Sequence, residues 1–377
     1  MYIPQKQLKK LQDLLRPNKV VVIYGPRRVG KTTLLKEFLK SANEKYLYVT
    51  GDDVTVQEYL SSQSLEKLKS FVGDHTLLVI DEAQQIENIG LNLKIIVDHI
   101  PGIKVIATGS STFDLAQHIG EPLVGRQFTL TLFPLAQMEL GGTETLPQTN
   151  ARLESRLQYG SYPEVVTAPS DRARLEILKE LTQTYLFKDI LEHEGIRNHK
   201  KIRSLLELLA LQVGQEVSYT ELGSQLGMSK NTIERYINLL EQVFIIVGVR
   251  GYSRNLRTVI RKSPRYYFYD MGVRNAIINN FNSLRLRNDV GKLWENYLFI
   301  ERMKKREYEQ IWSNVYFWRT YSQQEIDLIE EREGKLFGFE FTWSKDARRS
   351  VPSEWRHAYP DASFQVITPE NYLPFIT

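Results

Sequence analysis

A glycine-rich segment near the start of the chain constrains the fold more than any other feature. Residues 25–32 read Gly-Pro-Arg-Arg-Val-Gly-Lys-Thr, a full match to the phosphate-binding pattern G-x-x-x-x-G-K-[ST]. The β-branched run at 19–24 predicts a strand before the loop, and residues 31–40 have the periodicity of a helix after it. In that context backbone N–H groups and the positive end of the helix can surround phosphate oxygens. The motif therefore predicts a parallel α/β sheet that binds ATP.

The loop also predicts roles for its residues. Lys31 is expected to reach the β- and γ-phosphates, and the Thr32 hydroxyl is expected to bind Mg²⁺. ATP and Mg²⁺ are thus the predicted ligands. The residues expected to contact the nucleotide are Gly25, Pro26, Arg27, Arg28, Val29, Gly30, Lys31, Thr32 and Thr33.

Two acidic residues follow the apolar run at 76–80, which predicts another buried strand. Ligands of parallel sheets bind at the carboxyl ends of the strands, so Asp81 is expected to hold the Mg²⁺ shell. Glu82 is expected to polarise the attacking water. The strand predicted at 104–108 ends in hydroxyl residues, and Ser110 is the candidate contact to the γ-phosphate or the water.

Phosphoryl transfer often uses an arginine to stabilise the charge of the transition state. Arg126 is the main candidate, either within one subunit or across a subunit contact, and Arg28 in the loop is a second. The alternative for Arg126 is an ordinary surface salt bridge.

Composition excludes several other classes of protein. The chain has 377 residues, which predicts two or three domains, and it has no cysteine, so neither a disulfide framework nor a cysteine-based zinc site is possible. No apolar run is long enough to span a bilayer, and the first residues lack the pattern of a signal peptide. A cytoplasmic location without membrane contact is the expectation.

With these motifs placed, the chain resembles a family of prokaryotic ATPases. In that family an AAA-like ATPase domain precedes a C-terminal domain of unknown function with a degenerate nuclease fold. The resemblance covers nearly the whole chain, and its motifs follow one another in the family's order. They are GPRRVGKTTLL, LLVIDEAQ, ATGSS, VGR…LTLFPL, YGSYPEVV, PRYYFYDMGVRNAI, GKLWENYLFIE, VYFWRTYSQQEIDLI and FGFEFTWS.

The resemblance implies an ATPase, a winged helix–turn–helix in the middle and a restriction-endonuclease-like unit at the end. The predicted fold class is α/β: a parallel P-loop NTPase sheet, then a helical and winged helix–turn–helix part, then a small α/β restriction-endonuclease-like domain. The expected domains are an ATPase domain at 1–140, a helical connector at 141–212, the winged helix–turn–helix at 213–270 and the nuclease-like domain, expected to be inactive, at 271–377.

The middle of the chain is a candidate for DNA contact. Residues 218–243 have two helical patterns joined by a Gly-Met-Ser turn, and Ser229 is expected to cap the second helix. The region 250–287 is rich in arginine and has a single acid, Asp270. These basic side chains could contact phosphates without reading sequence. The alternative is a packing module that uses the same fold for protein contacts.

The last part carries the remnant of a nuclease motif. Glu295, Asp327 and Glu340 match three positions of the PD-(D/E)xK pattern, whose acids bind Mg²⁺. Position 342 is Thr where the pattern requires Lys, and Lys345 falls on the opposite face of the strand. A structural or nucleic-acid-docking remnant is therefore predicted rather than an active nuclease.

Three functions remain open from the sequence. The first is an ATPase switch linked to DNA through the winged helix, and the second is an ATP-gated module that binds a protein partner. The third is an ATP-dependent nuclease. A homo-oligomer is compatible with each of them.

Overall fold

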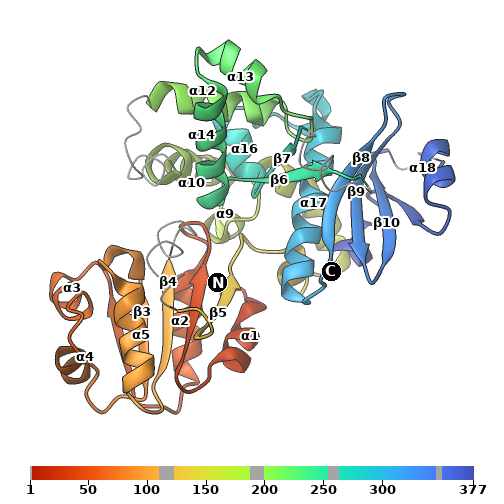
Figure 1. Cartoon of the computed structure of the whole chain (residues 1–377). Coiled ribbons are helices and arrows are strands. Elements are labelled where there is room, and N and C mark those ends of the chain that lie inside the picture. The colour runs from red at the N-terminus through yellow and green to blue at the C-terminus, as the bar shows by residue number, and fades with distance from the viewer. Residues whose placement is uncertain (1, 110–122, 187–198, 254–262, 345–349) are drawn as a thin grey trace. The chain divides into compact units, whose positions relative to one another are not determined.

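The computed structural model describes residues 2–109, 123–186, 199–253, 263–344 and 350–377 (Figure 1). The chain divides into two compact units. The first comprises Met1–Pro134 with Gln242–Phe244, and the second comprises Leu135–Glu241 with Ile245–Thr377. Among the described residues, no helix is long and apolar enough to cross a membrane.

The first unit is built on a parallel sheet of five strands, in the order β2-β3-β4-β1-β5 (Figure 1). The strands are β1 (Lys19–Tyr24), β2 (Tyr46–Thr50), β3 (Leu77–Asp81), β4 (Lys104–Gly109) and β5 (Gln127–Thr131). Successive residues of β1, β3 and β4 are buried, although their side chains point to opposite faces. Both faces of the sheet are therefore covered, as expected for a parallel sheet flanked by crossover helices.

One helix of this unit precedes the first strand, and the others lie in the connections between strands. They are α1 (Gln7–Leu14), α2 (Lys31–Lys40), α3 (Val54–Leu60), α4 (Leu65–Val72) and α5 (Ile89–His99). The side chains of Asp53 and Ser64 accept hydrogen bonds from backbone N–H groups at the starts of α3 and α4. Because all five strands are parallel, the carboxyl ends of β1, β3 and β4 lie at one edge of the sheet. The predicted P-loop and the predicted acids share that edge.

The second unit begins with a helical region. Its helices are α7 (Gln137–Leu140), α8 (Leu146–Tyr159), α9 (Pro163–Thr167), α10 (Asp171–Glu180), the π-helix η3 (Leu181–Leu186), α12 (His199–Leu211), α13 (Tyr219–Leu226), α14 (Lys230–Gln242) and α16 (Met271–Ile277). Gly227 ends α13 in the left-handed conformation, with φ of 58°, and α14 starts three residues later. This turn lies where the sequence predicts the helix–turn–helix.

A sheet of six strands completes the second unit, in the order β11-β10-β9-β8-β6-β7. Its strands are β6 (Ile246–Gly251), β7 (Arg265–Phe268), β8 (Asn314–Arg319), β9 (Glu325–Arg332), β10 (Lys335–Phe341) and β11 (Ser363–Ile367). The helices beside it are α17 (Val290–Tyr308), α18 (Ser353–Ala358) and α19 (Tyr372–Ile376), with the short 3₁₀ helix η4 (Leu284–Leu286) before them.

The predicted α/β fold class is confirmed: a parallel P-loop sheet is followed by a helical region and a further sheet. Strand β6 pairs with β7 in an antiparallel hairpin and with β8 in parallel. This hairpin, in the part of the chain where the winged helix–turn–helix is expected, is thus continuous with the C-terminal sheet. The domain boundaries at 140, 212 and 270 stay predictions.

Candidate nucleotide-binding site

The glycines of the P-loop lie where other residues would not fit. A Cβ on Gly25 would lie 2.1 Å from the carbonyl oxygen of Leu132. Gly30 has φ of 98° and stands directly before α2, so the loop enters the helix in a conformation that L-residues rarely adopt. The loop therefore has a backbone-lined form that suits a phosphate group, with the start of α2 behind it.

Lys31 is held against its own loop. Its ammonium donates hydrogen bonds to the carbonyl oxygens of Gly25, at 2.8 Å, and Pro26, at 3.0 Å. The residue is only 5% exposed. Charged phosphate oxygens are stronger acceptors than these carbonyls, so a bound nucleotide could compete for the same ammonium.

Three hydroxyl groups surround the carboxylate of Asp81. Thr32 Oγ1, at the start of α2, donates to Asp81 Oδ2 at 2.6 Å, and Tyr48, from β2, donates to the same oxygen at 3.1 Å. Thr108 Oγ1, from β4, donates to Oδ1 at 2.5 Å. Asp81 is 5% exposed, so these donors replace the water that burial removes. The structure thus brings Thr32 and Asp81, the two predicted magnesium ligands, into direct contact.

Tyr48 was not identified from the sequence. Burial raises the pKa of its phenol, and the neighbouring charge of Asp81 raises it further, so the hydroxyl stays protonated and donates. The residue lies in YLYVT, which reads as an ordinary apolar strand, and only the pairing of β2 with β3 places it beside Asp81. The signal available in the sequence was a tyrosine hydroxyl on a strand that could neighbour the strand ending in Asp81.

Glu82 lies just beyond β3 and is half-buried. Its backbone N–H donates to Thr108 Oγ1 at 3.1 Å, and its carboxylate accepts from Gln84 Nε2 at 2.5 Å. Its φ of 51° is left-handed, which is uncommon for a residue with a side chain. Thr108 therefore connects Asp81 to Glu82 through a single hydroxyl.

Ser110 and Arg28 are two further residues that the sequence predicts at the site. Ser110 lies outside the described residues. Arg28 belongs to the loop itself, is half-buried and has φ of 63°. Their expected roles stay predictions.

Arg126 is distant from the P-loop of its own chain. It precedes β5, and its carbonyl accepts from the N–H of Val20, near the first residue of β1. Strand β1 is six residues long and runs parallel to β5, so about 20 Å separate its first residue from the P-loop. Arg126 Nε pairs with Asp98 Oδ1 at 2.6 Å, and this contact lowers the pKa of Asp98. Of the two expected modes, action within one subunit does not fit this position.

The residues present fit a nucleotide with Mg²⁺. Among the described residues no group of three or more His, Cys, Asp or Glu could hold a metal by itself. Mg²⁺ beside a nucleotide needs no such group, because one or two protein oxygens, phosphate oxygens and waters complete its shell. Thr32 and Asp81 supply those two oxygens within 2.6 Å of each other.

In the second unit, the acids of the nuclease pattern come from different elements. Glu295 lies on α17, Asp327 on β9 and Glu340 on β10. Glu295 and Asp327 lie on either side of Arg265, whose Nη1 is 3.8 Å from one carboxylate and 4.0 Å from the other. Lys345 lies outside the described residues.

Part of the basic region is buried in ion pairs. Arg265, Arg274 and Arg287 are all at most 9% exposed, and the last two pair with Asp289 at 2.6 and 2.8 Å. These three side chains are not available to a polyanion. Arg250 and Arg285 are exposed, and Arg254, Arg257, Arg261 and Lys262 lie outside the described residues.

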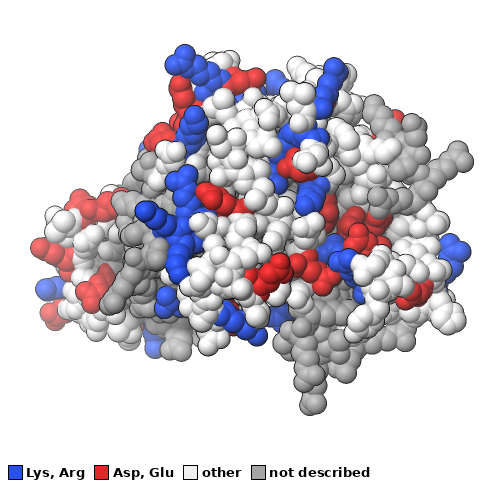
Figure 2. Space-filling view, turned by 90° about the horizontal axis from the view of Figure 1, so that it is seen from above, with Lys and Arg blue, Asp and Glu red and all other residues white. Residues whose placement is uncertain are grey.

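The second helix of the helix–turn–helix pattern has a polar outer face. Ser229 Oγ accepts from the N–H of Thr232 at 3.1 Å and so caps α14 as expected. On the face of the molecule shown in Figure 2, Lys and Arg lie interspersed with Asp and Glu. The exposed residues at the start of α14 are Lys230, Asn231, Glu234 and Arg235.

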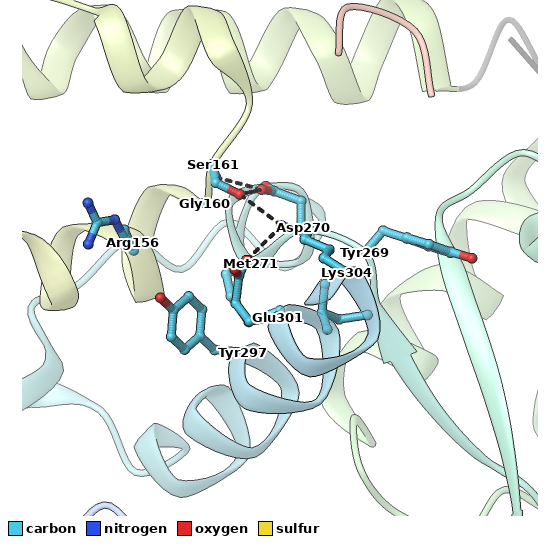
Figure 3. A pocket seen from close by; sticks show the side chains of 10 residues that line it. Arg156, Gly160, Ser161, Tyr269, Asp270, Met271, Tyr297, Glu301 and Lys304 are labelled. Atoms are coloured by element: carbon cyan, nitrogen blue, oxygen red, sulfur yellow. Dashed lines mark hydrogen bonds and ion pairs between the residues drawn. The ribbon is translucent and has the colours of Figure 1, made fainter. Parts of the chain in front are cut away.

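Several motifs of the second unit meet at one small cavity (Figure 3). Asp270, from the segment DMGVRNAI, accepts from the N–H of Ser161, in YGSYPEVV, at 2.7 Å. Lys304 Nζ, on α17, donates to Glu301 at 2.7 Å. Burial raises the pKa of Asp270, and the N–H groups around it oppose that rise. These motifs therefore form a buried polar core of this unit, and none of their residues was predicted as a site.

The fold and the site together define a class. A glycine-rich loop joins a buried parallel strand to a helix, and the threonine of the loop bonds to an acid at the end of another strand. This arrangement is that of a P-loop ATPase domain.

Comparison with known families identifies the domains. Residues 17–141 match the AAA domain, 150–284 match a domain of unknown function (DUF8612) and 290–374 match another (DUF4143). The chain thus carries an AAA-type P-loop ATPase domain and, in its C-terminal part, a DUF4143 domain.

Relatives have been found in bacteria and archaea. An uncharacterized protein of Mycobacterium tuberculosis is 27% identical, over 91% of this chain and 74% of the relative. An uncharacterized protein of Methanocaldococcus jannaschii is 25% identical, over 87% of this chain and 75% of the relative. A solved STAND protein of Pyrococcus horikoshii with a tetratricopeptide repeat sensor is 15% identical, with a TM-score of 0.29. That match covers 81% of this chain and 46% of the solved one.

Proposed function

We propose that this chain is a Mg²⁺-dependent ATPase that acts as a molecular switch. The proposal rests on the hydrogen bond that Thr32 Oγ1, at the end of the P-loop, donates to Asp81 Oδ2 at 2.6 Å. It supports a site in which a hydroxyl and a carboxylate lie ready for one hard cation.

The chain's own residues would divide the work of hydrolysis. The loop N–H groups and Lys31 bind the phosphates, and Thr32 and Asp81 hold Mg²⁺. When bound, Mg²⁺ neutralises the charge that develops on the phosphate oxygens. Glu82 accepts a hydrogen bond from the attacking water and orients it in line with the γ-phosphate.

The switch would work through the hydroxyls around Asp81. A cation at Asp81 competes with the hydrogen bond from Thr32, so its arrival changes the partners of this carboxylate. Thr108 donates to Asp81 and accepts from the N–H of Glu82, and it can pass that change to the next residue. The state of the nucleotide would thereby alter the loop after β3.

An arginine supplied by a second copy would complete the site. Arg126 lies at the amino end of the sheet, away from its own P-loop, which supports action across a subunit contact. This role implies a homo-oligomer in which Arg126 leaves Asp98 or lies beside it.

The output of the switch has two candidates. The exposed polar face at the start of α14, in a helix–turn–helix next to a hairpin, supports contact with DNA phosphates. The burial of Arg265, Arg274 and Arg287 in ion pairs favours the second candidate, a protein partner on the same unit. Contact with DNA and contact with a protein partner differ in how strongly salt weakens the binding.

The steady-state ATPase rate separates these candidates. It would be measured without DNA, with duplex DNA and with single-stranded DNA, each at low and moderate salt. Stimulation that declines as salt rises supports the DNA-linked switch. A rate that ignores DNA under all conditions removes that candidate, and a purified protein that exhibits no Mg²⁺-dependent turnover removes the proposed ATPase function.

A further inference from the structure

Arg265 lies beside two of the three acids that the nuclease pattern predicts, Glu295 and Asp327. The residue is the first of β7 and only 3% exposed. Its Nη1 is 3.8 Å from Glu295 Oε1 and 4.0 Å from Asp327 Oδ1, and its Nη2 donates to Glu325 Oε2 at 3.0 Å. The guanidinium therefore faces acids from α17 and from β9 at once.

Packing fixes this guanidinium in place. It lies over the ring of Phe317, on β8, with 4.3 Å between Cζ and the ring centroid. Tyr267, two residues further along β7, donates to Glu295 Oε1 at 2.7 Å and holds that carboxylate in position. The backbone of Arg265 also forms a bridge with Glu216. The side chain thus has one arrangement, imposed by neighbours on several strands.

The surrounding acids need a cation. Burial raises the pKa of Glu295, and the nearby charge of Asp327 raises it further, while Arg265 opposes both effects. Burial also disfavours the charged form of Arg265, but Tyr267 and the acids outweigh it and raise the pKa of Arg265. The guanidinium thus favours the charged forms of these carboxylates against burial and mutual repulsion.

With Arg265 among them, the same acids do not fit a metal ion. Asp327 Oδ2 already accepts from the N–H of Phe341 at 2.8 Å, and Thr342 stands where the nuclease pattern has lysine. In the arrangement that they adopt around Arg265, no three such side chains among the described residues form a group that could hold a metal. Mg²⁺ also demands open, near-octahedral coordination, which a neighbouring guanidinium obstructs.

We propose that Arg265 is a built-in replacement for the metal of this site: its guanidinium occupies the cation position among Glu295, Asp327 and Glu325. The C-terminal unit then binds no divalent cation there and cuts no nucleic acid. The acids serve to anchor the β6–β7 hairpin to α17 and β9. Removal of the guanidinium opens a divalent-cation site that the natural chain does not have.

Titration with Mn²⁺ tests the proposal. Nucleotide-free protein carrying Thr32→Ala, which removes a ligand of the P-loop, would be titrated while electron paramagnetic resonance records free Mn²⁺. This background chain is expected to bind no Mn²⁺. With Arg265→Ala added, it is expected to bind one Mn²⁺ per chain, and with Arg265→Ala and Asp327→Asn together it is expected to lose that site.

Thermal unfolding gives a second readout if Arg265→Ala folds poorly. Its Tm is expected to fall and to recover as Mn²⁺ is added, because the ion replaces the missing charge. The Tm of the Thr32→Ala chain with Arg265 intact is expected to be indifferent to Mn²⁺ and to a chelator. Arg265→Lys, which keeps a cation, is the matched control and is expected to gain no Mn²⁺ site.

Two results would overturn the proposal. One is Mn²⁺ binding by the chain with intact Arg265 that disappears in Asp327→Asn, since the acids would then hold a metal beside the arginine. The other is an Arg265→Ala protein whose binding and Tm both ignore Mn²⁺. Neither result depends on ATP turnover, so the proposed ATPase is tested separately.

Discussion

The two units use buried carboxylates in opposite ways. Asp81 in the first unit is surrounded by the hydroxyls of Thr32, Tyr48 and Thr108, all uncharged. Asp327 in the second unit lies beside the guanidinium of Arg265. A hydroxyl can turn away and let a metal ion take its place, but a packed guanidinium brings its own charge and cannot leave. A buried aspartate is therefore suited to bind a metal ion in the first unit and to stabilise the fold in the second.

The largest expected effect tests the proposed ATP hydrolysis in the first unit. Glu82→Gln keeps the shape of the side chain but removes the base, so kcat is expected to fall by about 10²–10⁴-fold while nucleotide affinity changes little. Steady-state turnover and equilibrium nucleotide binding measure the two quantities. Glu87→Gln, an exposed acid five residues on, is the control and is expected to keep normal kcat. A normal kcat in Glu82→Gln would remove this residue from the mechanism.

Lys31→Ala is expected to weaken nucleotide binding by about 100-fold or more. The change removes a buried ammonium from the phosphate position, a type of loss that costs about 2–5 kcal/mol. Titration calorimetry with a non-hydrolysable ATP analogue measures the affinity. Lys36→Ala alters an exposed lysine of the same helix and is expected to bind normally. Unchanged affinity in Lys31→Ala would contradict nucleotide binding by this loop.

Asp289→Asn tests how much a buried carboxylate with arginine partners stabilises the second unit. Burial favours the neutral acid, but the hydrogen bonds from Arg287 and Arg274 outweigh it and lower the pKa of Asp289 to about 2. A depressed pKa stabilises the fold above the unfolded value of 3.8, and that stability is lost as pH falls toward 2. The variant is expected to lose roughly 2 kcal/mol at pH 7, and the deficit should shrink below pH 4.

Urea unfolding at several pH values measures this loss. Asp171→Asn, which removes an exposed partner of Arg174, is the control and is expected to change stability by less than about 1 kcal/mol. A deficit in Asp289→Asn that stays the same down to pH 2 would show that lost packing, and not charge, is responsible.

The smallest expected effect concerns Tyr48. Tyr48→Phe removes one of the two hydroxyls on Asp81 Oδ2, a bond worth about 1 kcal/mol. The Mg²⁺ concentration needed for half-maximal turnover is expected to shift by about 5-fold, without loss of stability of the second unit. Tyr46→Phe, an exposed residue of the same strand, is the control. Equal Mg²⁺ dependence in both variants would show that the hydroxyl of Tyr48 has no part in the metal site.

The strands that carry the P-loop and its acids could be predicted from the sequence. The runs at 20–24 and 77–80 are continuously apolar, which is typical of buried parallel strands, and the structure has strands there. Strand β5 was missed because QFTLT alternates polar and apolar residues and forms an edge of the sheet. Thr32 and Asp81 were each expected to take part in Mg²⁺ binding, and the structure brings the two side chains into contact at one edge of the sheet.

The basic region shows what reasoning from the local sequence leaves out. A run of arginines with one acid suggested a polyanion-binding surface, but Arg274 and Arg287 meet Asp289, just beyond the run, and Arg265 meets acids 30 to 62 residues further on. The composition of a segment shows how many charged residues it has, but not with which residues they form ion pairs. Pairing across a sheet decides which charges remain for solvent.

The sequence by itself determined the P-loop, its strand and helix, and the acids opposite it, because these depend on local geometry and on the common direction of parallel strands. The tertiary structure alone decided that Tyr48 and Thr108 hold Asp81, that Arg126 lies far from its own loop, and that Arg265 fills the acid cluster of the second unit. Each of these contacts joins residues from separate strands or helices. Their proximity follows from strand order and register, which no local pattern encodes.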